Sequence, residues 1–118
     1  MFWKKLLGIF GEDIASDFLK KQGFKILKRN YRCKFGEIDI IAKEKDVISF
    51  VEVKTVATNK TETPFDTIDL RKRKHIQQTA SFYLNKEKKQ NLTCRFDVIS
   101  IRYKEDKEPE IELIRDAF

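Results

Sequence analysis

The chain has 118 residues, of which 41% are apolar and 37% are charged. This length suits a single domain over residues 1–118, and the apolar fraction excludes a disordered chain because it can supply a core. Lys and Arg number 25 against 19 Asp and Glu, a formal net charge of +6. The excess favours a polyanionic partner such as nucleic acid, although it also suits simple solubility.

Two features of the sequence bear on the compartment. Cys33 and Cys94 lack the spacing of a zinc site and are expected to be reduced thiols. The apolar run within residues 1–10 is too short for a signal peptide and leads directly into Glu12 and Asp13. No segment is long enough to span a bilayer, so we expect a cytoplasmic protein with no membrane partner.

An amphipathic helix is predicted over residues 11–22. Its apolar residues at helical spacing are Ile14, Ala15, Phe18 and Leu19, and Gly23 supplies a stop. Glu12 then falls in the first turn, at the edge of the apolar stripe. A carboxylate there is explained either by the helix dipole or by a functional role.

The rest of the chain is predicted to be mostly sheet. Period-two patterning marks strands at 24–32, 36–43 and 47–56, read most simply as an antiparallel meander. A loop from Ala57 to Thr67 and a long helix from Ile68 to Lys89 follow, then strands at 94–101 and 110–115, the last at an edge. The expected fold class is α/β, with a mixed central sheet and the order α-βββ-α-β-β.

The third strand carries two charges in an apolar setting. Ile48, Phe50, Glu52 and Lys54 share one face, while the other face is also largely apolar. A strand covered on both sides is normally central, and a buried charge needs a partner or a metal. Glu52 and Lys54 therefore form either an inert internal salt bridge or part of a reactive site.

Asp39 interrupts an otherwise apolar alternation in the second strand. If the two strands pair, Asp39 and Glu52 can converge, and their repulsion would be relieved by a hard divalent cation with oxygen ligands. The main-chain carbonyl of Val53 could add an oxygen, and Glu12 could approach from the first helix. The alternative for Asp39 is an outward polar position on a half-exposed strand.

Four consecutive cations lie near the start of the second helix: Arg71, Lys72, Arg73 and Lys74. They suit contacts to a phosphate backbone, or else form a solvated helix face. Lys72 lies four residues before Ile76 and so points nearest the core. His75 is expected on the helix surface, and Asp97 is expected to pair with Arg95 or a lysine rather than bind a metal.

Two segments carry a family resemblance. They are Gly36-Glu37-Ile38-Asp39-Ile40-Ile41-Ala42 and Phe50-Val51-Glu52-Val53-Lys54, which look like the Asp…Glu-x-Lys signature of the PD-(D/E)xK, or restriction-endonuclease-like, superfamily. More closely, nearly the whole chain resembles the YraN-like family of small bacterial proteins. That likeness extends to Gly11-Glu12, to Ile26 through Arg32, to Arg95-Phe96-Asp97-Val98 and to Ala117-Phe118.

The resemblance implies a restriction-endonuclease-like fold and a candidate nuclease site. Glu12, Asp39 and Glu52 would be ligands of Mg²⁺ or Mn²⁺, and Asp39, Glu52 and Lys54 would be catalytic, with Lys54 orienting or helping to deprotonate water. The implied substrate is structured DNA, with branched DNA included by likeness to archaeal junction resolvases. The same likeness suggests a homodimer. The alternative is a non-catalytic nucleic-acid-binding or scaffold protein that retains the fold.

Overall fold

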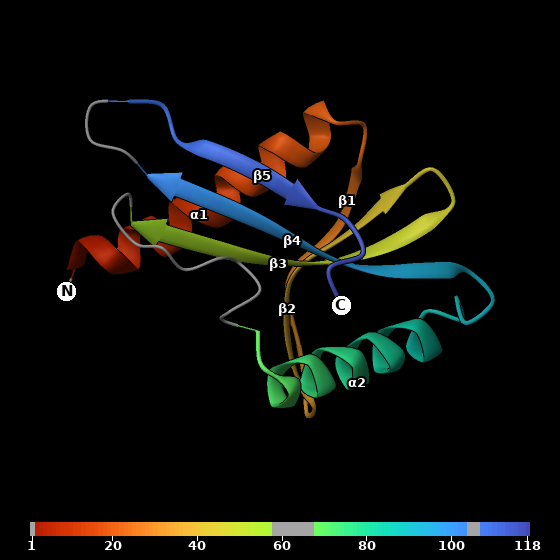
Figure 1. The fold of residues 1–118 in the computed structure, drawn as a ribbon. Helices are drawn as coiled ribbons and strands as arrows, with labels where there is room; N and C mark the ends of the chain where they lie inside the picture. Colours follow the sequence, from red (N-terminus) through yellow and green to blue (C-terminus); the bar gives the residue numbers. More distant parts are fainter. Residues whose placement is uncertain (1, 58–67, 104–106) are drawn as a thin grey trace.

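In a computed structural model of the protein, a mixed β-sheet lies between two helices, one against each face (Figure 1). The structure describes residues 2–57, 68–103 and 107–118. The elements in chain order are α1 (Phe2–Lys21), β1 (Lys25–Cys33), β2 (Gly36–Glu44), β3 (Val47–Ala57), α2 (Leu70–Lys86), β4 (Thr93–Tyr103) and β5 (Glu110–Ile114). The predicted α/β class and the order α-βββ-α-β-β are confirmed.

The five strands lie in the sheet in sequence order, β1-β2-β3-β4-β5. The first three form the predicted antiparallel meander. β4 then pairs with β3 in parallel, because α2 carries the chain back across one face, and β5 adds an antiparallel edge. β3 is therefore central, as its apolar residues on both faces predicted.

Each face of the sheet has its own apolar core. In one core, Ala15 and Leu19 of α1 pack on Ile40, Val51, Ile99 and Ile101 of the sheet; in the other, Ile76 and Tyr83 of α2 pack on Ile41, Ile48 and Phe50. Residues of β3 alternate between the two cores, so Glu52 follows Ile48 and Phe50 toward α2. The alternation read from the sequence thus determines which helix faces Glu52.

Helix α1 begins at Phe2, nine residues before the predicted start. The predicted range rested on the apolar spacing of residues 14–19; Gly11 does not end the helix, because one glycine costs it only about 1 kcal/mol. A Cβ at Gly11 would lie 2.7 Å from Cγ2 of Thr55 on β3. The absence of a side chain at position 11 therefore lets α1 approach β3 closely, just where Glu12 follows.

The β1–β2 hairpin bends at Asp39. Ile38 belongs to the core beneath α2, whereas Ile40 belongs to the core beneath α1, so the alternation of β2 breaks between them. On β1, Asn30 has a φ of 52° and lies between the pairs Arg29–Ile40 and Tyr31–Ile38. The bend carries the end of the hairpin toward α2 (Figure 1).

The other element boundaries lie close to the predicted ones. Helix α2 begins at Leu70 rather than Ile68 because Asp69 caps it, accepting a hydrogen bond of 2.8 Å from the amide of Lys72. It ends at Lys86, three residues early. The expected loop from Ala57 to Thr67 lies outside the described residues apart from Ala57, which ends β3. No helix in the described ranges is long and apolar enough to cross a membrane.

Candidate functional site

Asp39 lies where β2 and β3 separate. The last register pair of these strands is Ile40 with Val51. Beyond it, the backbone amide of Val53 donates to Oδ2 of Asp39 at 2.9 Å, so a side chain replaces the main-chain acceptor that the diverging strand no longer supplies. This bond holds the Asp39 carboxylate beside β3, at the level of Glu52.

Glu52 is a buried carboxylate with one charged neighbour of each sign. The residue is 6% exposed, and its carboxyl group lies beside that of Asp39 and interacts with it. Nζ of Lys72, on α2, lies 2.7 Å from Oε2 of Glu52. Burial and the adjacent Asp39 raise the pKa of Glu52 to about 7, against the opposing pull of Lys72.

Glu12 reaches the same place from α1, on the other side of Asp39. Its carboxyl group contacts that of Asp39, and burial together with the Asp39 charge raises its pKa. The side-chain amide of Asn30, oriented with its nitrogen toward Glu12, donates to both carboxylate oxygens at 2.9 and 3.1 Å. Glu12 lies in the middle of α1, so its interpretation as a helix-end charge is wrong.

Two lysines accompany these carboxylates. Lys54 is half-buried, and burial together with the neighbouring Lys72 lowers its pKa. Burial would also lower the pKa of Lys72, but its ion pair with Glu52 outweighs that effect and raises it. Within the described ranges, the ion-pair partner of Glu52 is Lys72 rather than the Lys54 that an internal salt bridge would have required.

The structure brings the predicted site residues together as a row, Glu12–Asp39–Glu52, with Asp39 in contact with both neighbours. Over the residues described, no three His, Cys, Asp or Glu side chains converge closely enough to hold a metal as they stand. Their carboxylate oxygens are the donors that a hard divalent ion takes. The chemical type of these ligands therefore fits Mg²⁺ or Mn²⁺. In this structure the cation beside Glu52 is the ammonium of Lys72.

The four cations of α2 do not share one environment. Arg71 and Lys74 are exposed, whereas Lys72 turns inward to Glu52. Nε of Arg73 donates to the carbonyl of Ile68 at 3.0 Å, and its guanidinium lies over the ring of Phe118. The sequence analysis counted Lys72 among the DNA contacts but placed it as the cation nearest the site, where the structure has it. The signal for its inward position was its spacing of four from the buried Ile76.

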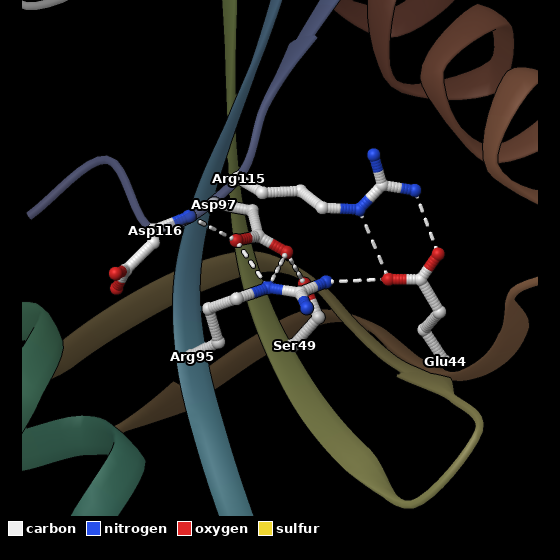
Figure 2. Close-up of polar contacts among 6 residues, drawn as sticks. All are labelled: Glu44, Ser49, Arg95, Asp97, Arg115 and Asp116. Atoms are coloured by element: carbon white, nitrogen blue, oxygen red, sulfur yellow. Dashed lines mark hydrogen bonds and ion pairs between the residues drawn. The ribbon is translucent and has the colours of Figure 1, made fainter.

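Asp97 belongs to a separate polar cluster (Figure 2). It is fully buried and accepts hydrogen bonds from the hydroxyl of Ser49, from Nε of Arg95 at 2.8 and 3.0 Å, and from the amide of Asp116 at 2.8 Å. The expectation that Asp97 pairs with Arg95 is confirmed. Its contacts are those of a structural residue that fastens β3, β4 and the segment after β5.

His75, Cys33 and Cys94 do not belong to the carboxylate row Glu12–Asp39–Glu52. The imidazole of His75 is exposed, and its Nδ1 lies 2.9 Å from the carbonyl oxygen of Phe35, so it ties α2 to the tip of the hairpin. Cys33 and Cys94 are both free thiols. These positions agree with the surface location expected for His75 and with reduced cysteines.

The sequence matches the family described as "Uncharacterised protein family UPF0102" over residues 11–101. A UPF0102 protein of Caldicellulosiruptor saccharolyticus is 44% identical over 116 residues, which cover 98% of each chain. One from Clostridium perfringens is 39% identical over 117 residues, and one from Clostridium botulinum is 44% identical over 119, each covering more than nine-tenths of both chains. UPF0102 is the family that the sequence resembled as YraN-like. The chain therefore belongs to the UPF0102 family.

Proposed function

We propose that this protein is a Mg²⁺- or Mn²⁺-dependent phosphodiesterase acting on DNA. The observation that carries the proposal is the row of carboxylates Glu12–Asp39–Glu52, partly or wholly buried and flanked by Lys54 and Lys72. Burial raises the pKa values of Glu12 and Glu52, and so does their repulsion by the neighbouring Asp39 carboxylate. A divalent cation held by Glu12, Asp39 and Glu52 would relieve this repulsion.

The bound metal would activate water and offset charge that develops on the phosphate. Lys54 would orient the attacking water or help to deprotonate it, and its lowered pKa makes the neutral, proton-accepting form more accessible. Lys72 would release Glu52 when the ion enters. The Lys72 ammonium would then be free to bind the anionic substrate.

DNA is the proposed substrate because of the charge distribution. The chain has a net charge of +6, and Arg71 and Lys74 are exposed on the helix that carries Lys72. Exposed cations beside a phosphate-cleaving centre suit contacts with the phosphate backbone. Branched or otherwise structured DNA, and action as a homodimer, are carried over from the superfamily resemblance and are part of what the experiment must test.

The test is cleavage of labelled DNA in the presence of Mn²⁺, with a four-way junction, a flap and a plain duplex offered in parallel. We expect cleavage of a branched substrate by the wild type. Loss of Lys54 as a general acid–base group in Lys54→Ala should cost on the order of 10²- to 10⁴-fold in rate. Glu52→Gln, which keeps the shape of the side chain but removes a ligand charge, should abolish cleavage.

Lys88→Ala is the matched control, since Lys88 is an exposed lysine just after α2 and outside the row. It should cleave like the wild type. Equal rates in wild type, Lys54→Ala and Glu52→Gln would point to a contaminating nuclease and refute the assignment. Sedimentation of the free protein and of its junction complex decides between a monomer and the homodimer.

The second candidate is a nucleic-acid-binding or scaffold protein without turnover. The observation in its favour is the Lys72–Glu52 ion pair, which already gives the buried carboxylate a cation at 2.7 Å. This candidate predicts DNA binding that weakens with salt, with no product from any substrate in Mn²⁺. It also predicts that Glu52→Gln binds DNA as the wild type does.

A further inference from the structure

A second surface, separate from the carboxylates, combines aromatic rings, amides and cations. It is an open groove of about 760 Å³ between the turn of the β1–β2 hairpin and the outer face of α2. The lining residues are Phe35 from the turn, and Lys74, Gln77, Gln78, Ser81, Phe82, Asn85 and Lys86 from α2. We call it the hairpin groove.

The α2 lining is one continuous stripe. Positions 74, 77, 78, 81, 82 and 85 recur at spacings of three and four and so lie along one side of the helix. Five of them are exposed polar residues, and Phe82 is half-buried among them. A stripe of this kind offers hydrogen-bond donors and acceptors around an accessible ring.

The floor of the groove is aromatic. The rings of Phe35 and Phe82 meet edge to face, with centroids 6.1 Å apart, and both remain partly exposed. The position of Phe35 is fixed, because its carbonyl contacts His75 and because Gly36 lets the turn approach α2. A Cβ at Gly36 would lie 3.2 Å from Oγ1 of Thr79. The ring pair is thus built into the fold at a fixed place.

The charge of the groove has one sign. Lys74 and Lys86 line it, the ammonium of Lys34 lies 5.2 Å from the centroid of the Phe35 ring, and the lining contains no Asp or Glu. Cations select an anionic partner, and an aromatic platform selects one that has flat rings to stack. Side-chain amides suit the polar edges of bases that are not already paired.

We propose that the hairpin groove binds a single-stranded segment of DNA, with a base stacked at the Phe35–Phe82 pair and the phosphates near Lys74 and Lys86. This inference deepens the proposed function and rests on it for the choice of DNA. Lys72 and Lys74 lie in the first turns of α2, and a helix rises about 1.5 Å per residue. The groove therefore leads away from the carboxylates along the helix that carries Lys72, as a track for an unpaired strand beside a cleaved branch.

The test is fluorescence anisotropy of a labelled single strand of about 12 nucleotides, within the usual range of site sizes, titrated with protein in EDTA so that no metal-dependent cleavage occurs. The wild type should bind the single strand more tightly than a duplex of the same length. Phe82→Ala should weaken the single-strand complex on the order of tenfold to a hundredfold. Its salt dependence should be unchanged, because no phosphate contact is lost.

Lys86→Glu should also weaken binding, and its control is Lys20→Glu, the same charge reversal at an exposed position at the end of α1. Phe82→Leu, which preserves packing against Phe35 without a π-face, separates loss of stacking from loss of folding. It should bind as poorly as Phe82→Ala while unfolding like the wild type. Equal losses in Lys86→Glu and Lys20→Glu, or full affinity in Phe82→Leu, would overturn the proposal.

The experiment also separates this proposal from the one on which it rests. Glu52→Gln should bind the single strand like the wild type, since the groove does not include the carboxylates. If the protein cleaves DNA with metal but the groove variants bind the single strand like the wild type, only the proposal for the groove is overturned. A groove that instead joins two copies of the chain would give a dimer that Phe82→Ala dissociates, which also refutes the single-strand assignment.

Discussion

Replacing Asp97 with alanine is expected to destabilise the fold by about 3–5 kcal/mol, the range for removing one partner of a buried ion pair. Asp97 is fully buried and accepts hydrogen bonds from Ser49, Arg95 and the amide of Asp116 (Figure 2). Its loss leaves those donors without their acceptor in a site that water does not reach. Urea unfolding of wild type and Asp97→Ala measures the difference.

Arg95 explains why the penalty is large. Its side chain is 18% exposed, and its Nη2 also contacts Glu44 at 2.8 Å, which in turn holds Arg115. Removing Asp97 leaves a partly buried guanidinium with a single carboxylate shared between two arginines. If Asp97→Ala does not fold at all, Asp97→Asn, which keeps the shape and one acceptor oxygen, should fold with an intermediate loss.

The control for Asp97 is Asp13→Ala. Asp13 also pairs with an arginine, at 2.7 Å from Nη2 of Arg29, but its side chain is 53% exposed. Exposed pairs contribute about 0–1 kcal/mol because water and salt screen them. A loss for Asp97→Ala no larger than that for Asp13→Ala would contradict a structural role for the cluster in Figure 2.

Binding of Mn²⁺ is expected to strengthen about a hundredfold between about pH 5 and about pH 8, because metal ligands must be deprotonated. Burial and Asp39 raise the pKa of Glu52 to about 7. Below that pH a proton occupies the carboxyl group and must leave before the ion enters, so affinity falls about tenfold per pH unit. Above it, the carboxylate is already charged and the affinity levels off.

The raised pKa of Glu52 has the opposite effect on the stability of the metal-free protein. A carboxyl group whose pKa is raised on folding stabilises the protein below its ordinary pKa, and that contribution is lost as the pH rises through about 7. The metal-free protein should therefore become less stable over the interval in which metal affinity grows. Thermal unfolding with and without Mn²⁺ at several pH values measures both effects.

Glu52→Gln tests the assignment of this titration. The variant has no carboxyl group to titrate at position 52, so its residual Mn²⁺ affinity should be weaker and should vary less with pH. Lys88→Ala again serves as the control and should reproduce the wild-type profile. A wild-type affinity that is equal at about pH 5 and about pH 8 would show that Glu52 is not a ligand.

The fold could be predicted from the sequence wherever one periodicity dominates. Along β3, Val51 and Val53 alternate with Phe50 and Glu52, and the structure places these pairs against α1 and α2 as the alternation requires. A central position for β3 followed from its two apolar faces. The antiparallel meander of β1 to β3 followed from their short turns, whereas the parallel pairing of β4 with β3 was not predicted.

The start of α1 could not be predicted because the sequence has no sharp boundary there. The predicted helix began at residue 11, yet Gly11 lies within α1 and its missing side chain accommodates Thr55. A single glycine in the sequence does not reveal that α1 and β3 pack closely at that point. The consequence was a wrong explanation of Glu12, which lies in mid-helix beside Asp39 rather than at a helix end.

The ion-pair partner of Glu52 could not be identified from local spacing along β3. Lys54 lies two residues from Glu52 on the same face, but the ammonium beside Glu52 is that of Lys72, on the helix α2 that covers this face of the sheet. The bend at Asp39 and Asn30 likewise depends on a positive φ that an asparagine permits without requiring it. Local spacing identified the carboxylates and placed Lys72 nearest to them, but its ion pair with Glu52 depends on how α2 packs.

The central claim is that Asp39 and its two carboxylate neighbours bind one divalent cation. Calorimetric titration of Mn²⁺ at about pH 8 into wild type and Asp39→Asn tests it most directly, because asparagine can still accept the Val53 hydrogen bond but lacks the charge. We expect saturable binding by the wild type, at least tenfold weaker binding by Asp39→Asn, and no change in Asp13→Asn. Equal titrations of wild type and Asp39→Asn, or no heat of binding from either, would contradict the claim.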